Sequence, residues 1–198
     1  MKDDGVARLE AIIRATPWML RVLGAARATA PPGWWVGGGV LRDLVWDRLH
    51  GHFDPARVKD VDLAFYDPAD LSHAREVALE HALAAHLPSV AWDAKNQAAV
   101  RQEPGCGAHL VPGRFGARVA PLDSAAAGVA TWPETATAVA VRLHADDGLE
   151  VLAPCGLADL LDGVCRRNPC RVTVEEYRRR LVRKRVPERW PKVVIIDP

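Results

Sequence analysis

The feature that most constrains this fold is a run of three glycines between a short apolar stretch and a helical pattern. Residues 34–36 predict a short strand, Gly37, Gly38 and Gly39 predict a turn, and residues 40–49 predict an amphipathic helix. The residues expected to face the core are Val40, Leu41, Leu44, Val45 and Leu49. A helix that follows such a turn exposes backbone amides at its N-terminus, where phosphate oxygens bind well.

Arg42 lies one turn into this predicted helix. Its guanidinium can bind phosphate oxygens through two parallel hydrogen bonds, which a lysine cannot do. The three glycines and Arg42 are therefore candidate phosphate-binding residues. The alternative is a tight turn that requires positive φ, with Arg42 as a surface ion-pair partner of Asp43 or Asp47.

Two acids alternate with apolar residues in the next predicted strand, residues 60–66. Side chains two apart on a strand share a face, so Asp60 and Asp62 project together while the apolar residues between them point into the core. Such like charges repel unless a cation lies between them, and Mg²⁺ takes carboxylate oxygens together with substrate phosphates. We therefore expect Asp60 and Asp62 to bind Mg²⁺ or Mn²⁺ in a cleft facing the glycine turn. The alternative is a strand edge with two solvated acids.

The rest of the chain predicts helices and strands that form an α+β fold, a small mixed sheet with helices packed against it. Pro17 interrupts the first helical stretch, residues 8–23, which predicts two short helices or one broken helix. Further helices are expected at residues 72–86 with a serine cap, near Pro133, and at residues 157–161 and 174–185. Further strands are expected at residues 90–97, 137–143, 149–152 and 193–196, and a loop at residues 103–120.

Composition is that of an ordinary globular protein. The 198 residues are 49% hydrophobic and 26% charged, which predicts a single domain with its core at about residues 34–160 and a basic C-terminal helix and strand at residues 172–198. The formal net charge of +1 predicts no whole-molecule attraction to nucleic acid or to an anionic membrane. There is no apolar run of membrane-spanning length and no signal-peptide pattern, so we expect a cytoplasmic protein without a membrane partner.

Residues 37–43 (GGGVLRD) followed by 60–63 (DVDL) resemble the signature of the polymerase-beta nucleotidyltransferase superfamily. In its Gly-Gly-x-x-x-Arg-Asp form the first segment is similar to the head domain of tRNA CCA-adding enzymes. The linker at residues 50–59 is longer than is typical of those enzymes. A resemblance to a bacterial family of minimal nucleotidyltransferases extends over about residues 34–196, through the segments KNQA at 95–98, WPETATA at 132–138, APCGLADL at 153–160 and WPK at 190–192.

The resemblance implies a reaction and a set of ligands. The glycines and the arginine would hold the triphosphate of a nucleoside triphosphate, and the paired acids would hold two metal ions. An acceptor hydroxyl or another nucleophile would attack the α-phosphorus in line and release pyrophosphate. The acceptor is unknown and is left open between RNA and protein.

The superfamily usually adds a third carboxylate from a neighbouring strand. Along residues 90–97, Asp93, Lys95 and Gln97 share one face, so Asp93 is our candidate for a catalytic and metal-binding acid beside Asp60 and Asp62. Glu134 is the competing candidate, and a site with two acids is a further alternative. Lys95 is a candidate phosphate-binding residue, with a plain surface lysine as the alternative.

The basic run at residues 177–185 has two interpretations. In the first, its charges together with Tyr177 and Trp190 bind along an RNA acceptor. In the second, they form a solvated helix face, which we favour because charge runs usually are solvated. Trp92 and Trp132 are candidates for stacking on a base. Two other functions are weighed against nucleotidyl transfer. One is an antitoxin-like regulatory protein that keeps the fold without turnover, and the other is a dinucleotide binder, which the absence of GxGxxG disfavours.

Overall fold

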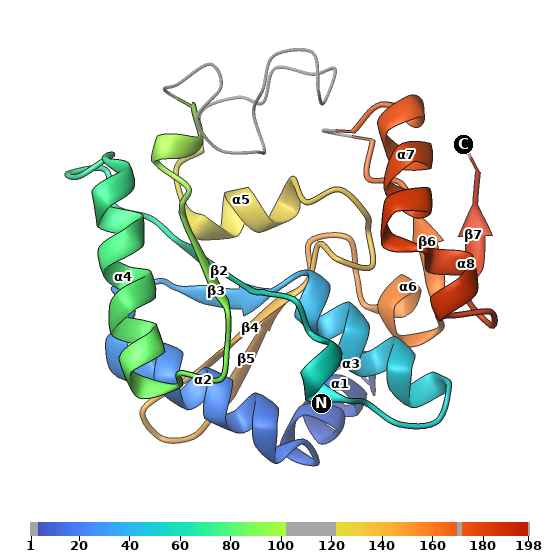
Figure 1. The fold of residues 1–198 in the computed structure, drawn as a ribbon, viewed down its shortest axis with the longest axis horizontal. Coiled ribbons are helices and arrows are strands. Elements are labelled where there is room, and N and C mark those ends of the chain that lie inside the picture. The colour runs from blue at the N-terminus through green and yellow to red at the C-terminus, as the bar shows by residue number, and fades with distance from the viewer. Residues whose placement is uncertain (1–3, 102–121, 170–171, 198) are drawn as a thin grey trace.

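The computed structural model describes residues 4–101, 122–169 and 172–197. Its centre is a five-stranded sheet in the order β3-β2-β1-β4-β5 (Figure 1). The strands are β1 Trp35–Gly37, β2 Val61–Phe65, β3 Trp92–Asn96, β4 Ala140–Leu143 and β5 Leu149–Leu152. Strands β2 and β3 are parallel and the other neighbours are antiparallel, so the sheet is mixed. The predicted α+β class with a small mixed sheet is confirmed.

Helices surround this sheet and a second, two-stranded parallel sheet lies beside it (Figure 1). The small sheet consists of β6 Val164–Arg166 and β7 Val194–Ile196. The longer helices are α1 Asp4–Arg14, α2 Pro17–Thr29, α3 Gly39–Leu49, α4 His73–His86 and α7 Val174–Lys184. The shorter ones are α5 Ala125–Ala130, α6 Ala158–Leu161, α8 Val186–Arg189, and the 3-10 turns η1 Pro55–Arg57 and η2 Ala99–Arg101.

Local residues explain where several helices begin. Pro17 is the first residue of α2 and separates it from α1, as its lack of an amide hydrogen predicts. The hydroxyl of Ser72 accepts a hydrogen bond from the Arg75 amide at 3.3 Å and caps α4, which confirms the predicted cap. The Thr173 hydroxyl caps α7 in the same way, because it accepts from the Glu176 amide at 3.2 Å.

Different helices pack on the two faces of the central sheet. Helices α1 to α4 bury one face in the large core cluster, to which β2 contributes Val61, Leu63 and Phe65. Helix α5 covers the other face, where Ala64 belongs to a smaller cluster. Because side chains alternate along a strand, Asp62 shares the face of Ala64 and projects on the side of α5.

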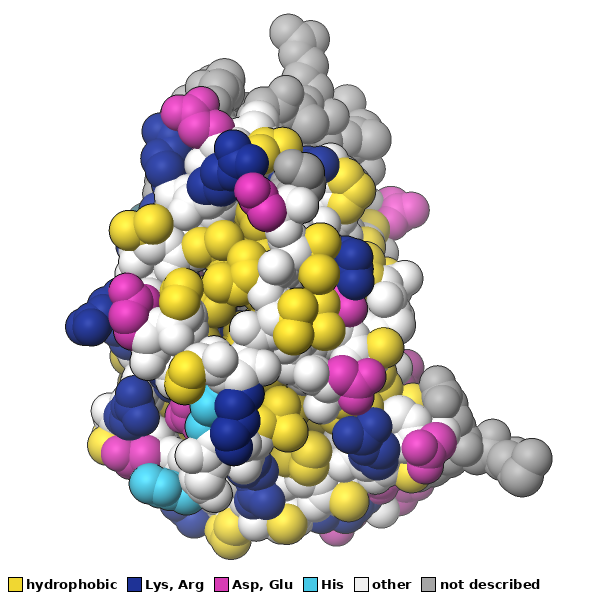
Figure 2. Space-filling model, turned by 90° about the vertical axis from the view of Figure 1, so that its right-hand side faces the viewer, with side chains coloured by type: hydrophobic (Ala, Val, Ile, Leu, Met, Phe, Trp, Pro, Cys, Tyr) yellow, Lys and Arg dark blue, Asp and Glu magenta, His cyan; other side chains and the backbone are white. Residues whose placement is uncertain are grey.

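The C-terminal elements α7, α8 and β7 lie along one side of the molecule, next to α6 and β6 (Figure 1). Tyr177 and Trp190 are fully buried, and the rings of Trp46 on α3 and Trp190 pack edge to face with centroids 5.2 Å apart. Figure 2 shows the outer face on this side, where hydrophobic side chains gather and Lys and Arg are interspersed with Asp and Glu. In the described part of the chain, no helix is long and apolar enough to cross a membrane.

Two predicted details are wrong. No helix begins near Pro133, because the backbone there pairs with a distant segment: the Asn168 amide donates to the Pro133 carbonyl at 2.9 Å and the Thr135 amide to the Arg166 carbonyl at 3.0 Å. Leu49 does not face the core, since it is 41% exposed at the end of α3. The predicted loop at residues 103–120 lies outside the described residues.

Candidate active site

The turn between β1 and α3 needs two of its glycines for different reasons. Gly37 is the last residue of β1, and a Cβ atom there would collide with the Val139 carbonyl oxygen on the neighbouring segment. Gly38 has a φ of +67° and precedes the first residue of α3, Gly39. The predicted three-glycine turn is therefore shorter than expected, and Gly37 is a strand residue that allows close packing.

Three acids lie side by side where β2 and β3 begin. Asp62 is in register with Asp93 on the parallel strand β3 and with Gly37 on the antiparallel strand β1, and Asp60 directly precedes β2. Burial, and then the charges of Asp60 and Asp93, raise the pKa of Asp62 to about 7, although the charge of Lys184 and a hydrogen bond from the Gly39 amide lower it. We call Asp60, Asp62 and Asp93 the acidic wall.

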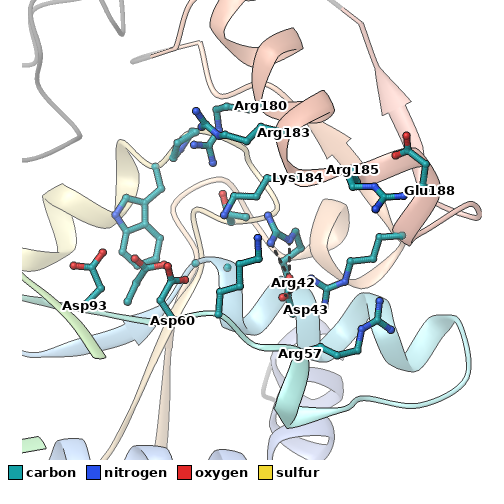
Figure 3. A pocket seen from close by; sticks show the side chains of 18 residues that line it. Arg42, Asp43, Arg57, Asp60, Asp93, Arg180, Arg183, Lys184, Arg185 and Glu188 are labelled. Carbon is teal, nitrogen blue, oxygen red and sulfur yellow. Dashed lines mark hydrogen bonds and ion pairs between the residues drawn. The ribbon is translucent and has the colours of Figure 1, made fainter. Parts of the chain in front are cut away.

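The acidic wall and the glycine turn line one pocket of about 680 Å³ (Figure 3). Helix α7 and its C-terminal end form the opposite side of the pocket. We call its Arg180, Arg183, Lys184 and Arg185 the basic wall. The other lining residues are Gly38, Gly39, Arg42, Asp43, Arg57, Lys59, Trp132, Pro133, Thr137, Glu188 and Arg189.

Arg42 belongs to a buried ion-pair network. Its Nε and Nη2 donate to Asp43 Oδ1 at 3.0 and 2.7 Å, and its Nη1 lies 4.0 Å from Glu134 Oε2. Its guanidinium lies 5.0 Å from the centre of the Trp190 ring. Burial by itself lowers the pKa of Arg42, but Asp43 and Glu134 raise it, so the guanidinium stays charged. The alternative prediction for Arg42 is a surface ion pair with Asp43 or Asp47. Arg42 does pair with Asp43, but it is only 5% exposed, so the pair is buried.

The same network fastens the C-terminal segment to α3. Arg189 donates from Nη1 to Asp43 Oδ2 at 2.8 Å, and from Nη2 to Asp47 Oδ2 at 3.1 Å. The indole Nε1 of Trp190 donates to Asp47 Oδ1 at 2.7 Å. Asp43 therefore binds Arg42 with one carboxylate oxygen and Arg189 with the other.

Glu134 and Asp93, the two candidates for a third acid, occupy different places. Glu134 is buried, accepts from Arg180 Nε at 2.8 Å, and is not among the described residues that line the pocket. Burial raises the pKa of Glu134, but Arg180 and Arg42 outweigh this and lower it. Asp93 lines the pocket, and Lys95 Nζ lies 2.6 Å from its Oδ1. Lys95 itself lines a small hollow beside the pocket, of about 30 Å³, and not the pocket itself.

Helix α7 presents two different faces. Tyr177, Arg180 and Lys184 recur with helical spacing, so they share the face that meets the rest of the molecule; Tyr177 is fully buried and the other two line the pocket. Arg178 and Arg179 face away, with side chains 57% and 62% exposed. The prediction of a merely solvated basic helix is therefore wrong for the inward face.

The acidic wall fits a hard cation. Its donors are all carboxylates, the ligands that Mg²⁺ and Mn²⁺ accept, and their mutual repulsion is what a bound dication offsets. Within the described ranges, no group of three or more His, Cys, Asp or Glu side chains is placed so that it could hold a metal ion by itself. A metal bound here would therefore need further ligands, which substrate phosphates supply.

A family model described as nucleotidyltransferase matches residues 24–195. The chain belongs to this nucleotidyltransferase family. It is also similar to a solved NMR structure described as revealing a CCA-adding enzyme head domain, with 28% sequence identity and a TM-score of 0.74 over 96% of this chain and 94% of the other. No curated protein matches the chain. The predicted superfamily, fold and enzyme class are confirmed.

Sequence reasoning missed several residues of the nucleotidyltransferase pocket. Arg57 and Lys59 come from the linker before β2, and Arg189 comes from α8, which was not predicted. A usable signal existed only for α7, where the helical spacing of Tyr177 and Arg180 would have indicated an inward face. Of the two tryptophans suggested for stacking, Trp132 lines the pocket, whereas Trp92 packs against the core.

Proposed function

We propose that this nucleotidyltransferase uses Mg²⁺ or Mn²⁺ to transfer a nucleoside monophosphate from a nucleoside triphosphate to an acceptor, with release of pyrophosphate. One observation carries the proposal: the acidic wall and the amide-rich start of α3 line the same pocket. Carboxylates bind metal and helix N-termini bind phosphate, so together they suit a metal-bound triphosphate. We propose that the protein acts in the cytoplasm, which supplies both the metal ion and the nucleoside triphosphate.

The triphosphate would bind at Gly38, Gly39 and Arg42. Helix α3 is 11 residues long, and its first backbone amides lie at the pocket, where the helix dipole favours negative charge. Gly38 and Gly39 have no side chain that would stand between a ligand and this backbone, although the Gly38 amide donates to the Val139 carbonyl at 3.0 Å and the Gly39 amide to Asp62. Arg42 adds a guanidinium held in place by Asp43 and Trp190.

Asp60, Asp62 and Asp93 would hold the metal. Bound divalent metal would neutralise charge on the triphosphate and stabilise the attacking and leaving oxygens. Asp62 is the central acid, since it lies between the Gly39 amide and its register partner Asp93. This placement would bring the metal and the phosphates to the same end of β2.

Asp93 is our candidate for the proton acceptor. As the acceptor oxygen forms its bond to the α-phosphorus, the bond from that phosphorus to the bridging oxygen breaks, pyrophosphate leaves, and the hydroxyl proton passes to an Asp93 carboxylate oxygen. Lys95, 2.6 Å from Asp93, would position that carboxylate and would not bind phosphate as first predicted. Trp132 would stack on the base, since its ring lines the pocket beside Gly38.

The test measures where a label on the α-phosphate of the nucleotide ends up. Wild-type protein is incubated with each nucleoside triphosphate labelled on that phosphate, with Mg²⁺ or Mn²⁺, and with RNA and protein fractions as acceptors. We expect pyrophosphate release and label in one fraction, whereas the Asp60→Asn and Asp62→Asn double variant should give neither. Triphosphate binding without transfer to any acceptor would instead support the regulatory alternative.

A further inference from the structure

Helix α7 carries a pocket-lining lysine that no acid of the described residues contacts directly. Lys184 is half-buried, and among the described residues it takes part in no hydrogen bond or ion pair. Burial, and then the charges of Arg42 and Arg180, lower the pKa of Lys184, whereas the charges of Asp60 and Asp62 across the pocket raise it. Figure 3 shows its side chain directed from α7 into the pocket, between Arg42 and Asp60. Asp60 and Asp62 attract this inward ammonium group from across the pocket, but no anion is bound to it directly, which is costly for a half-buried charge.

Lys184 and three arginines line this part of the pocket, and the arginines share few acids. Arg42 and Arg180 both contact the buried carboxylate of Glu134, and Asp43 is shared between Arg42 and Arg189. No acid of this network is left for Lys184. An anion bound between α3 and α7 would relieve the repulsion among these cations and pair with the free ammonium group.

The position of Lys184 is fixed by its neighbours. One turn earlier on the same face, Arg180 is tied to Glu134 at 2.8 Å, and beyond α7 Arg189 is tied to α3. A lysine that only complemented the negative C-terminal end of α7 would work equally well facing solvent, whereas Lys184 is half-buried and lines the pocket. The inward direction of Lys184 therefore points to a ligand.

We propose that Lys184 is a nucleotide-binding residue that contacts the pyrophosphate portion of the triphosphate, from the side of the pocket opposite the glycine turn. The proposal rests on the proposed function, which puts the triphosphate at the start of α3. Lys184 lies toward Arg42, and Asp93, where the acceptor would react, lies beyond Asp60 in Figure 3. This arrangement favours the leaving phosphates over an acceptor.

The experiment measures the binding of Mg²⁺-ATP and of Mg²⁺-pyrophosphate by calorimetry. Pyrophosphate carries no base, so it isolates the phosphate contacts. We expect Lys184→Ala and Lys184→Gln each to weaken both ligands about tenfold or more, the weight of one charge-assisted hydrogen bond, and Lys184→Arg to retain most of the affinity. The matched control is Arg179→Ala, which removes a cation from the outward face of α7 and should leave both affinities unchanged.

The outcomes separate this inference from the proposed function. If wild-type protein binds neither ligand, the proposed function fails. If wild-type protein binds both and the folded Lys184→Gln variant binds them equally well, Lys184 is not a phosphate ligand and only this inference is overturned. The inference is also overturned if the variant keeps both affinities but loses binding to a single-stranded oligoadenylate, because Lys184 would then serve the acceptor. The Gln variant keeps most of the aliphatic stem, so it preserves packing if the Ala variant does not fold.

Discussion

The acidic wall and the basic wall face each other across one pocket, but the chain builds them in different ways. The acids come from the starts of adjacent strands, so strand register places Asp62 beside Asp93. The basic wall is carried by α7, whose position depends on ion pairs with residues far away in the sequence, such as Arg180 with Glu134. The difference teaches that the acidic side of the pocket follows from strand pattern and register, and the basic side from ion pairs between side chains far apart in the sequence.

Metal removal should have the largest effect, and it tests only the acidic wall. Chelation by EDTA should reduce transfer to background, because the repelling carboxylates cannot hold the triphosphate in position without a cation. Added Mg²⁺ or Mn²⁺ should restore the rate, as measured by pyrophosphate release. Transfer at the full rate in EDTA would contradict the metal assignment.

Asp62→Asn should lower the rate of transfer by about 10³-fold, roughly 4 kcal/mol in the barrier. The variant should fold normally, because Asn keeps the shape of the side chain and removes one of three neighbouring like charges. Asp162→Asn, at an exposed acid in a loose 3.7 Å pair with Arg8, is the control and should keep the wild-type rate. A drop in melting temperature matching the loss of rate would mean that Asp62 is structural.

Glu134→Gln tests the attachment of the basic wall. We expect it to lower the free energy of unfolding by about 3 kcal/mol, because Arg42 and Arg180 would keep buried charges without their shared acid. Urea denaturation measures this, and Glu188→Gln at an exposed acid of the same pocket should change it by less than about 0.5 kcal/mol. If the variant lost transfer but kept its stability, Glu134 would take part in the reaction and would not be a structural residue.

Trp132→Ala should have the smallest effect, about tenfold weaker nucleotide binding, or roughly 1.4 kcal/mol, from the lost stacking on the base. Trp132→Phe should retain most of the affinity because it keeps an aromatic face. Inorganic pyrophosphate, which has no base, should bind all three proteins equally. Unchanged ATP affinity in the Ala variant would place the base elsewhere in the pocket.

The features that were predicted correctly from the sequence depend on patterns that span only a few neighbouring residues. The alternation around Asp62 located β2, the parity of Asp93 put it on the pocket side of β3, and the glycine run located the start of α3. These features need only a few neighbouring residues, so a single chain reveals them. The resemblance to nucleotidyltransferases then supplied the roles, which the geometry alone does not give.

The features that sequence-based prediction missed depend on contacts between segments far apart in the chain. Pro133 suggested a helix start, but its carbonyl is taken by the Asn168 amide. The spacing of Tyr177 and Arg180 indicates an inward face of α7, but nothing local shows that the partner of Arg180 is Glu134, so the basic run was interpreted as solvated. Buried charges on α3, such as Asp47, are understandable only once Arg189 and Trp190 are in place.

The shared carboxylate of Asp43 has a consequence for the chain while it is being made. Its two partners are Arg42, next to it, and Arg189, 146 residues later. At about 5–20 residues per second, a ribosome needs roughly 7 to 30 s to travel from one to the other. During that interval the acids of the acidic wall are added first, and α7 and α8 are added only at its end. A chain that has not yet reached α7 and α8 therefore lacks one side of the pocket, and the pocket is complete only when these two helices have left the exit tunnel.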